Sequence, residues 1–550
     1  MSDNKAMAKL LFPNITALPK DYEEKYPPRN LKEGAIVTRF APSPTGFLHF
    51  GGLFAGFIGR TAAKSTDGVF YLRIEDTDKK REVENGAELI IKGLNDFGIE
   101  IDEGVVSQTE EKGIYGPYTQ SKRTEIYQAF VKDLVEKGLA YPCFMTEDEI
   151  AKIRQVQEAK KELPGIYGEY AKYRSITVEE AKKLISEGRE YVVRLNSPGK
   201  VGGRIKFKDM IKGEIEMDEN ILDVVLLKKD GTPTYHFAHA VDDHLMRTTH
   251  VIRGDEWISS VPIHLQLFWV CGFKNVKYAH ISPIMKEEDG SKRKLSKRKD
   301  PEAAVSYYEE MGYPKGAVWE YLLTLANSNY EEWRACNKDA SPDDFKFSFS
   351  KMSKAGALFD LVKFNDISKN YISTLDAEEV YSLTLDWAKD NNQKLYDLLS
   401  DDEKYATSIF AIERGNKKPR KDIAKWSDVE GYISYFYNEL WDNNRSYADN
   451  LTKDAIKEIL LKYREVYTVD IDADNWFPAV KEMAVELGYA GAPKEYKKNP
   501  DAYKGHVGDV AGVIRVAVTG RTNTPDLYEI MQVLGYDEVM RRLDEAIETL

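Results

Sequence analysis

The sequence predicts an α/β protein in which a parallel-sheet domain is split by an inserted α+β domain and followed by a helical module. Three observations support this prediction. A strand–turn–helix–strand pattern lies within residues 35–74, strand-like runs return at 221–227 and 249–252, and helical periodicity dominates from residue 380 onward. A βαβ unit implies parallel strands, with ligands bound beyond their carboxyl ends. The mixed, strongly charged segment 121–215 interrupts the strands as an insertion would.

The βαβ unit begins with the run AIVTRF at 35–40, which is typical of a short buried strand. The turn APSPTG at 41–46 follows, and apolar residues then recur at helical spacing from Phe50 to Ala62. A glycine ends this helix, and VFYLRI at 69–74 indicates the second strand.

Composition limits the classes of protein that fit. The chain has 550 residues and 42% apolar residues, enough for several cores. No run approaches the ~18 consecutive apolar residues that a transmembrane helix needs. Residues 1–34 lack a secretory signal and carry acids such as Asp21, which predicts an N-terminal arm on a cytoplasmic protein. Cys143, Cys271 and Cys336 are far apart, so neither a disulfide framework nor a thiolate zinc site is indicated.

The formal net charge of −13 argues against nucleic acid as a partner, because phosphate contacts need Lys and Arg. Binding depends on local charge, however, and two basic segments lie at 292–299 and 414–425. Basic runs are more often solvated surface than binding sites. Composition alone therefore leaves nucleic-acid binding open.

Two segments follow the predicted strands directly. In PSPTGFLHFGG (42–52), glycines permit close backbone approach, and His49 at the start of a helix can donate to a phosphate oxygen. In RIEDTD (73–78), three acids at a strand end could hold a cation or an amino group. The alternative for the second segment is a polar strand-to-helix turn with Asp or Thr as cap.

The segment TPTYHFAHAVDDH (232–244) contains three histidines and two aspartates that could suggest a metal site. We expect a strand here, on which the two histidines of HxxH lie on opposite faces because side chains alternate. A zinc site is therefore disfavoured. The strings KLSKR (294–298) and KMSKA (351–355) each offer lysines that could stabilise charge on a triphosphate, but only one can serve an active site.

These segments, in this order, resemble the bacterial-type glutamyl-tRNA synthetases, a class I aminoacyl-tRNA synthetase family. TRFAPSPTGFLHFGG is similar to the first class I signature, with HFGG where the class pattern is HIGH. LRIEDTD, GTPTYHFA and VDDHLM…IRGDEW are similar to the glutamate-site segments, and KLSKR to the second signature. HVGDVAGVIRVAVTG resembles the closing helices. The related glutaminyl enzymes typically read PEPNG at the first turn, so PSPTG favours glutamate.

The resemblance implies a Rossmann-type parallel-sheet domain followed by α-helical stem-contact and anticodon-binding domains. The expected domains are an N-terminal arm (1–34), the first half of the catalytic domain (35–120), the inserted acceptor-binding domain (121–215), the second half of the catalytic domain (216–285), the KLSKR loop with the stem-contact domain (286–378) and the anticodon-binding module (379–550).

The resemblance also implies an activity, namely ATP-dependent ligation of L-glutamate to tRNA(Glu). A glutamyl-adenylate forms, and AMP and pyrophosphate are released, with Mg²⁺ accompanying ATP. We expect a monomer with no membrane association. The alternatives are a glutaminyl-tRNA synthetase, a shorter tRNA-modifying relative, or a silent paralogue that only binds RNA. The long helical C-terminal module argues against the short relative, and both signatures retain phosphate-binding residues.

Residue roles follow from the resemblance and from charge. The predicted catalytic residues are His49, Lys294 and Lys297. The predicted glutamate-binding residues are Arg39, Ala41, Ser43, Glu75, Tyr235, His239 and Arg253. The predicted ATP-binding residues are His49, Gly51, Glu256 and Lys297. The basic segment supplies the predicted tRNA-binding residues Arg414, Lys417, Lys418, Arg420 and Lys421. For Arg253 the alternative is a structural ion pair with Asp255 or Glu256.

The sequence departs from the family at three places. Some members hold zinc in the inserted domain, but here the corresponding segment has only Cys143 and no nearby His, so no zinc is expected. His239 stands where the family often has Asn. The arm of about 34 residues exceeds the usual start, and no role follows for it. Of the two lysine strings, 294–298 is expected to be catalytic and 351–355 to lie beside the tRNA stem.

Overall fold

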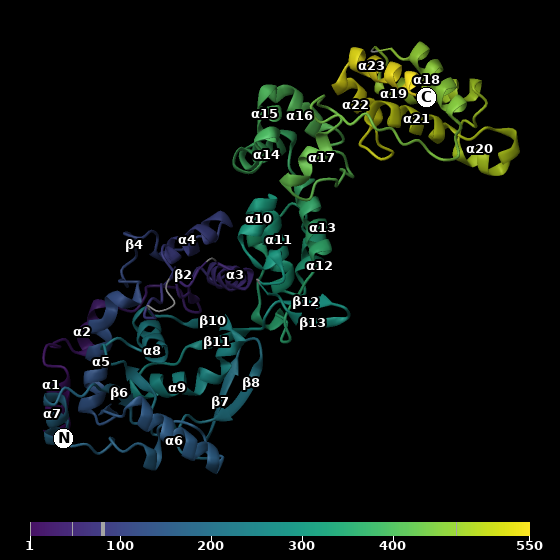
Figure 1. The fold of residues 1–550 in the computed structure, drawn as a ribbon. Coiled ribbons are helices and arrows are strands. Elements are labelled where there is room, and N and C mark those ends of the chain that lie inside the picture. The colour runs from purple at the N-terminus through teal and green to yellow at the C-terminus, as the bar shows by residue number, and fades with distance from the viewer. Residues whose placement is uncertain (1, 47, 79–82, 297, 469) are drawn as a thin grey trace. The chain divides into compact units, whose positions relative to one another are not determined.

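A computed structural model describes the chain except for residues 1, 47, 79–82, 297 and 469. The chain forms two compact units. The first comprises Met1–Tyr307 and Trp319–Asp360, and the second comprises Tyr308–Val318 and Leu361–Leu550. Every named strand lies in the first unit, whereas helices build the second (Figure 1).

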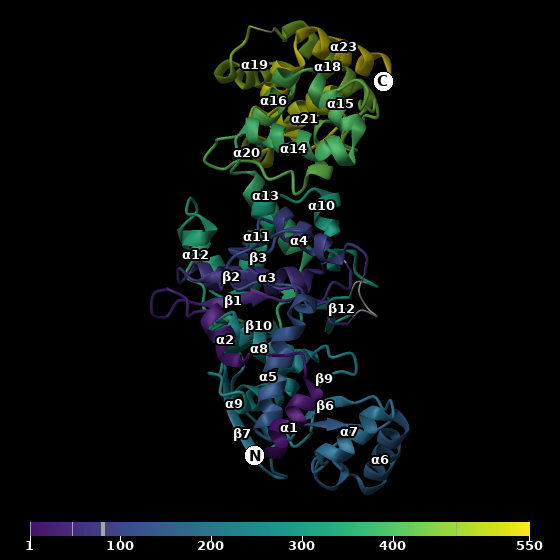
Figure 2. The same ribbon diagram turned by 90° about the vertical axis from the view of Figure 1, so that its left-hand side faces the viewer.

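The predicted βαβ unit is confirmed. Strand β1 (Val37–Phe40) pairs in parallel with β2 (Val69–Leu72), and helix α3 (Phe50–Lys64) connects them. Leu53, Phe57 and the other apolar residues of the periodic run are buried along α3, which packs on both strands (Figure 2).

The sheet continues through two short strands, in the order β1-β2-β3-β4. Helix α4 (Gly86–Asp96) leads from β2 to β3 (Glu103–Val105), which is parallel to β2, and β4 (Glu111–Lys112) closes the edge in the antiparallel direction.

A second sheet has the order β10-β11-β7-β8. Its members are β10 (His250–Gly254), β11 (Lys277–Ile281), β7 (Arg204–Asp209) and β8 (Gly213–Asp218), and α9 (Val261–Val270) connects β10 to β11. β10 and β11 are parallel, and β7 joins β11 at one residue pair, Asp209 with Tyr278. The two sheets meet where the Thr249 N–H donates to the Val37 carbonyl at 2.9 Å.

A separate antiparallel sheet has the order β5-β6-β9; β5 and β6 lie in the segment expected to be an insertion, 121–215, whereas β9 lies beyond its predicted end. Its strands and nearby helices are α5 (Thr124–Glu136), β5 (Ala140–Cys143), α6 (Glu147–Lys160), α7 (Val178–Ser186), β6 (Val192–Leu195) and β9 (Val225–Leu227). In Figure 2 the blue segment with α6 and α7 forms a lobe at the edge of the unit. Cys143 is buried in β5.

The N-terminal residues form two packed helices, α1 (Ser2–Leu11) and α2 (Pro19–Lys25), both against α5. Tyr26 is fully buried and donates from its hydroxyl to the Gly116 carbonyl at 2.8 Å. Arg29 forms two hydrogen bonds to the Glu103 carboxylate, at 2.7 and 2.9 Å. The segment is therefore an integral part of the first unit rather than a loose arm.

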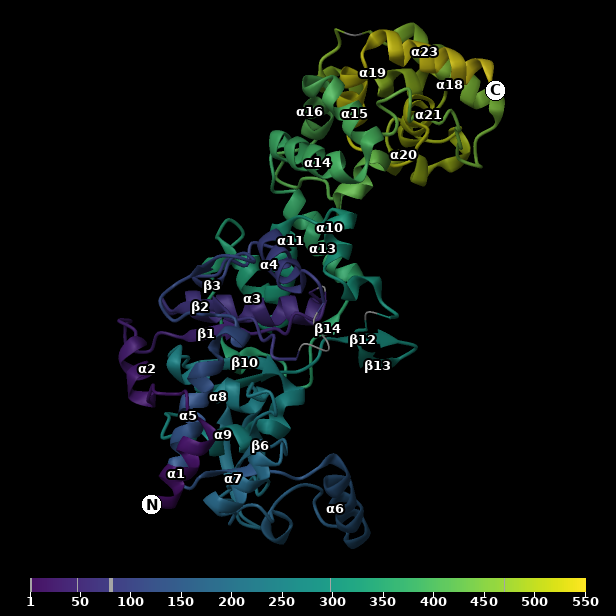
Figure 3. The same cartoon turned by 60° about the vertical axis from the view of Figure 1, so that its left-hand side comes forward.

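A small sheet of order β13-β12-β14 ends the strand-bearing part of the chain. Strands β12 (Met285–Glu288) and β13 (Ser291–Lys294) form a hairpin that projects at the edge of the unit, and β14 (Leu358–Phe359) pairs in parallel with β12 (Figure 3). Helices α10 (Ser306–Met311), α11 (Lys315–Ala326) and α12 (Tyr330–Cys336) lie between β13 and β14 in the sequence. The first lysine string begins at the last residue of β13.

The second unit confirms the predicted helical module. Its main helices are α13 (Leu361–Ile372), α14 (Ala377–Asn391), α15 (Gln393–Asp401), α16 (Glu403–Ala411), α17 (Val429–Ile433), α18 (Lys453–Val466), α19 (Ala473–Glu486), α20 (Pro493–Lys498), α21 (Val507–Thr519), α22 (Leu527–Leu534) and α23 (Tyr536–Glu548). Local signals set their ends: the Asp376 carboxylate caps α14 by accepting from the Glu379 N–H. Gly520, at φ 70°, ends α21 in the left-handed region that glycine tolerates. One apolar cluster surrounds Trp426 and another surrounds Trp476.

The short 3-10 helices are η1 (Gln120–Arg123), η2 (Gly168–Tyr170), η3 (Asp255–Ser260), η4 (Pro301–Ala303), η5 (Pro342–Asp344), η6 (Phe349–Lys351), η7 (Trp426–Asp428) and η8 (Pro500–Ala502). In the part of the chain that the structure describes, none of the helices has the length and apolar character needed to cross a membrane.

Candidate active site

A cavity of about 730 Å³ opens where β1, β2, β10 and β11 end. This is the position at which parallel α/β sheets bind ligands. Predicted residues from segments far apart in the sequence line it together: Arg39, Ala41, Ser43, His49, Gly51, Glu75, Tyr235, Arg253, Glu256 and Lys294. His239 is buried behind this wall, and Lys297 lies outside the described residues.

The first wall is the turn into α3. His49 is the N-cap residue of α3, and its Nδ1 accepts from the Gly52 N–H at 2.9 Å. The other ring nitrogen, Nε2, therefore carries the proton of the neutral imidazole and can donate. A Cβ on Gly51 would lie 3.1 Å from His49 Nδ1, so glycine keeps this turn compact. The exposed imidazole and the helix N-terminus place N–H groups of the kind that suit an anion at this wall of the cavity.

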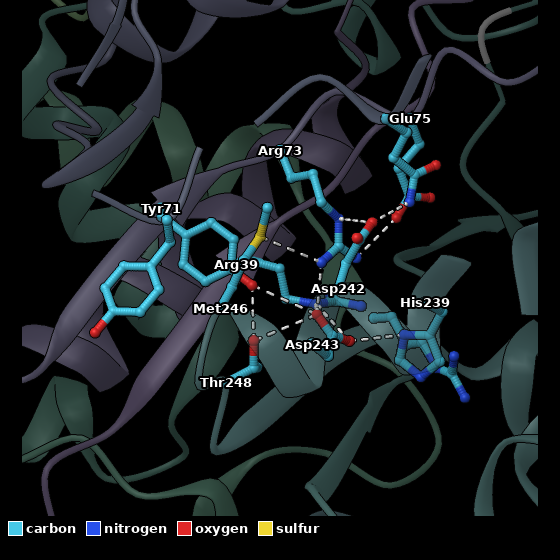
Figure 4. Close-up of polar contacts among 12 residues, drawn as sticks. Arg39, Tyr71, Arg73, Glu75, His239, Asp242, Asp243, Met246 and Thr248 are labelled. Atoms are coloured by element: carbon cyan, nitrogen blue, oxygen red, sulfur yellow. Dashed lines mark hydrogen bonds and ion pairs between the residues drawn. The ribbon is translucent and has the colours of Figure 1, made fainter. Parts of the chain in front are cut away.

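The second wall contains a buried ionic network that sequence reasoning missed. Arg73 is fully buried and donates to Glu75 at 2.9 Å and to Asp243 at 2.7 Å (Figure 4). Arg39 also donates to Asp243, at 3.2 Å. Burial by itself would raise the pKa of Asp243, but the Arg39 and Arg73 charges hold that pKa well below its ordinary value. Asp243 is therefore an anion that both arginines share.

The neighbouring aspartate on helix α8 (Tyr235–Leu245), Asp242, extends the network and lies 3.8 Å from Arg73. It accepts from Arg123 at 2.7 Å, from Gln120 at 2.9 Å and from the Tyr127 hydroxyl at 2.8 Å. The network thus balances three arginines against three carboxylates, all of them buried. Its members are Arg39, Arg73, Arg123, Glu75, Asp242 and Asp243.

Glu75 is the one carboxylate of this network that lines the cavity. Burial raises the pKa of its carboxyl, and the charges of Arg73 and Arg39 oppose that rise. A cationic group bound in the cavity would stabilise the ionised form further.

Arg253, unlike Arg39 and Arg73, has no carboxylate partner among the described residues. Only 7% of the residue is exposed, yet within the described residues no carboxylate lies within 4.0 Å of its guanidinium. Asp255, one half of the alternative considered from the sequence, instead pairs with Lys212 at 3.0 Å. The guanidinium contacts neutral groups, including the Tyr235 hydroxyl at 3.4 Å. A buried, unneutralised cation beside a cavity is a site for a carboxylate.

The expectation of a strand at 232–244 is wrong, because residues 235–245 form helix α8. His236 and His239 lie one turn apart on this helix, and both contact His264. The Nδ1 of His236 lies 3.0 Å from the Nε2 of His264, and the ring centres of His239 and His264 are 4.4 Å apart. Phe237, Val241 and Leu245, spaced by four residues and buried, are the helical signal that could have revealed it.

His239 itself faces the protein interior. Its Nδ1 lies 2.7 Å from Asp243, its Nε2 lies 3.2 Å from the Tyr278 hydroxyl, and its ring stacks on Tyr235. Burial lowers the pKa of His239 to about 3, so the imidazole is neutral. Its predicted role in glutamate binding would therefore act through Tyr235.

The remaining cavity wall contains Glu256 and Lys294, the last residue of the β12–β13 hairpin. Glu256 folds over Gly254, where a Cβ would lie 2.2 Å from its carboxylate, so glycine makes room for this position. Lys294 ends β13 with an exposed side chain. Arg293 anchors the hairpin through hydrogen bonds of 2.6 and 2.7 Å to Asp300, whose pKa these bonds hold well below its ordinary value.

The second lysine string is tied down by its backbone. The Lys354 carbonyl accepts from Lys212 Nζ at 2.8 Å and from Ser282 Oγ at 2.7 Å. Gly356 has φ 101°, and a Cβ there would lie 2.4 Å from the Pro283 carbonyl oxygen. These contacts, with the β14 pairing that follows, hold the backbone of 351–359 in place, although most of its side chains are exposed.

The basic segment of the second unit divides into two groups. Arg414 donates to the carbonyls of Phe410, Ile372 and Leu375, each at 2.8 Å, and Arg420 pairs with Asp422 at 2.7 Å. These two arginines hold the local fold, whereas the predicted contacts Lys417, Lys418 and Lys421 are exposed.

Comparison with known proteins yields consistent matches. Residues 35–366 match the family described as tRNA synthetases class I (E and Q), catalytic domain, and residues 496–547 match an anticodon binding domain. A glutamate–tRNA ligase of Clostridium perfringens (strain 13 / Type A) is 55% identical over 541 residues, covering 98% of this chain and 99% of the relative. The glutamate–tRNA ligase of Bacillus subtilis (strain 168) is 34% identical, covering 92% and 99%. A crystal structure of a glutamate tRNA ligase from Elizabethkingia meningosepticum CCUG26117, in complex with its amino acid, is similar with a TM-score of 0.73 and 28% identity, covering 94% of this chain and 99% of that one.

Proposed function

Since the chain belongs to the glutamate–tRNA ligases of the class I tRNA synthetases, we infer that its cavity is where glutamate is activated with ATP. The reaction is the aminoacylation of tRNA(Glu) with glutamate, at the expense of ATP. The observation that supports glutamate as the substrate is the charge of the cavity. The buried network is balanced, and Arg253 remains as one unneutralised cation.

Glutamate carries one ammonium group and two carboxylates, a net charge of −1, and Arg253 is a buried guanidinium with no carboxylate partner among the described residues. We propose that its side-chain carboxylate pairs with Arg253, beside the Tyr235 hydroxyl. Glu75 would receive the ammonium group, with Arg39, Ala41 and Ser43 beside it at the cavity wall. Glutamine, which has no net charge, would leave Arg253 buried and unpaired, and this costs free energy.

Activation needs no protein nucleophile, because the α-carboxylate of glutamate attacks the α-phosphorus of ATP and releases pyrophosphate. The protein contributes positioning and charge stabilisation. His49 and the N-terminus of α3 would bind phosphate oxygens beside Gly51, and Glu256 would contact the ribose or adenine. Lys294 and Lys297 would close over the phosphates. The terminal 2′-hydroxyl of the tRNA then takes the acyl group.

Mg²⁺ would enter with ATP, held by phosphate oxygens and water. Among the described residues, no cluster of three or more His, Cys, Asp and Glu side chains is arranged to hold a metal ion. The inserted sheet and 121–215 would contact the acceptor end, 286–378 the stem, and 379–550 the anticodon. We propose that the enzyme acts as a cytoplasmic monomer.

An ATP–pyrophosphate exchange assay tests the assignment, with tRNA present because this family generally needs it for activation. Exchange should depend on glutamate, and glutamine at equal concentration should support far less. Equal exchange with both amino acids, or none with glutamate, would contradict the proposal. Charging of purified tRNA(Glu) and tRNA(Gln) then defines the range of tRNA substrates.

A further inference from the structure

Two imidazoles hold the buried Arg253 guanidinium. Its Nε donates to His280 Nε2 at 3.1 Å, and one terminal nitrogen lies 3.2 Å from His264 Nδ1. The same terminal nitrogen reaches the Trp257 carbonyl at 3.4 Å, and the guanidinium lies 4.9 Å from the centre of the Tyr278 ring. Among the described residues, the other terminal nitrogen makes only the long contact to the Tyr235 hydroxyl, at 3.4 Å. It is therefore available to an incoming carboxylate.

The hydrogen bonds of His280 fix its tautomer. Its Nδ1 lies 2.7 Å from Asp209, a buried carboxylate that also accepts from the Ile211 and Lys212 N–H groups. Nδ1 must therefore carry the proton, which leaves Nε2 with a lone pair for the Arg253 N–H. A proton on Nε2 would place two N–H donors against each other.

The same reasoning applies to His264. Because its Nδ1 accepts from Arg253, its Nε2 carries the proton and donates to His236 Nδ1 at 3.0 Å. Burial lowers the pKa of His264 well below its ordinary value and that of His236 to about 4. Burial also lowers the pKa of His280, although its hydrogen bond to Asp209 opposes this. All three rings are therefore neutral, and each has one nitrogen that donates and one that accepts.

Because both imidazoles are neutral, they hold Arg253 without compensating its positive charge. A carboxylate at either position would orient the guanidinium equally well but would neutralise it, as Asp243 does for Arg39. An imidazole lone pair orients the guanidinium and leaves its positive charge for the substrate. The choice of histidine at both positions thus separates orientation from charge.

We propose that His264 and His280 are positioning residues for substrate specificity, which fix the plane of Arg253 through neutral lone pairs and so reserve its charge for the side-chain carboxylate of glutamate. This inference rests on the proposed function of the cavity. Neither histidine is among the residues that line the cavity, and neither was singled out by the sequence motifs.

The test is a pair of isosteric variants at position 264. His264→Asn keeps a neutral oxygen near the place of Nδ1, and His264→Asp adds only a charge. The Asp variant should raise the KM for glutamate at least about 30-fold above the Asn variant, the scale for loss of a buried charge pair, while their KM values for ATP agree within about 3-fold. The preference for glutamate over glutamine should fall in the Asp variant alone.

His250 provides the matched control. It lies on the same strand as Arg253, is similarly buried, and contacts Thr249 and the Phe349 ring instead. His250→Asn and His250→Asp should have the same KM for glutamate, and thermal melting of every variant establishes that it is folded. If His264→Asp does not fold, His280→Gln and His280→Glu make the same comparison from the other side of Arg253.

Each outcome decides the inference. Equal KM values for glutamate in the Asn and Asp variants would overturn it, as would an equal rise in the KM values for glutamate and ATP. An effect of His264→Asp that persists in full in an Arg253→Ala background would overturn it too, because the charge must act through Arg253. If the wild-type enzyme shows no glutamate-dependent exchange, the proposed function fails instead.

Discussion

Arg73, just beyond β2, donates to Asp243 on α8 at 2.7 Å, and neither side chain is exposed to solvent. This pair joins the sheet to the helix that carries Tyr235 and His239, two residues of the predicted glutamate site. The geometry of the cavity therefore depends on a buried charge pair that does not itself line the cavity.

Asp243→Asn should destabilise the first unit by about 3–5 kcal/mol, because it leaves Arg73 and Arg39 with less compensating charge in a buried setting. Hydrogen exchange of the α8 amides in increasing urea measures this cost. Asp218→Asn is the control: its carboxylate pairs with Arg204 at the exposed surface, and the change should stay within about 0.5 kcal/mol. An Asp243 variant as stable as this control would contradict the prediction.

The same variant has a defined dependence on pH. The pKa of Asp243 is lowered in the folded state, so its contribution is fully present above the ordinary value of 3.8 and is lost as pH falls through the folded pKa. The wild-type protein should therefore lose stability in acid over a range in which Asp243→Asn loses less. Parallel acid-unfolding curves for the two proteins would show that Asp243 is not the titrating group.

Arg253→Ala should lower kcat/KM for glutamate by an amount that corresponds to a loss of about 2–5 kcal/mol in transition-state stabilisation, the range for leaving a buried charge without its partner. The KM for ATP should change little, because the proposed phosphate site at His49 lies on α3. Arg204→Ala, at an exposed position of β7, is the control for loss of an arginine. Normal glutamate kinetics in Arg253→Ala would remove the basis for the specificity assignment.

Replacing Lys417, Lys418 and Lys421 with Ala should weaken tRNA binding and leave ATP affinity unchanged. Each lost phosphate contact should flatten the dependence of log K on log salt by somewhat under one unit. Binding titrations at several salt concentrations measure the slope. A wild-type slope in the triple variant would mean that this segment is solvated surface.

Arg414→Ala is the contrasting variant in the same segment. Its guanidinium is committed to three backbone carbonyls, so the substitution should lower the melting temperature of the helical unit. A selective loss of tRNA affinity without a loss of stability would assign Arg414 to the RNA interface instead.

Lys297→Ala should lower the activation rate by about 2–4 kcal/mol with little change in the KM for glutamate, the result expected for a group acting on the transferring phosphate. Lys354→Ala should barely alter activation, since the 351–359 segment is held by backbone contacts. ATP–pyrophosphate exchange in the presence of tRNA compares the two. If only Lys354→Ala is impaired, the catalytic string has been assigned to the wrong part of the chain.

Several features could be predicted from the sequence because they depend on local pattern. The βαβ unit follows from an apolar strand, a glycine-rich turn and helical periodicity within 35–74, and the structure has each of these elements. The helical second unit follows in the same way. The prediction of a strand at 232–244 was wrong, because the side chains of its histidines were expected to alternate between two faces. The four-residue spacing of Phe237, Val241 and Leu245 indicates a helix.

The N-terminal residues show where local pattern stops being informative. Nothing in residues 1–34 predicts that Tyr26 is fully buried or that Arg29 bonds to Glu103, because both contacts are made with segments about 70 to 90 residues away. A short amphipathic helix has no stable partner until the rest of the unit has folded. The packing of residues 1–34 therefore becomes visible only in the folded structure.

The sequence by itself determined which chemical groups are available: two arginines for a carboxylate, an acid for an ammonium group, a histidine and lysines for phosphates. Only the tertiary structure decided how these charges are distributed. It commits Arg39 to Asp243 and leaves Arg253 among neutral imidazoles, although the sequence presented both as equal candidates. The physical reason is that the energy of a charge depends on burial and on its distance to other charges. In this chain those distances join β1, β10 and α8, which only the fold brings together.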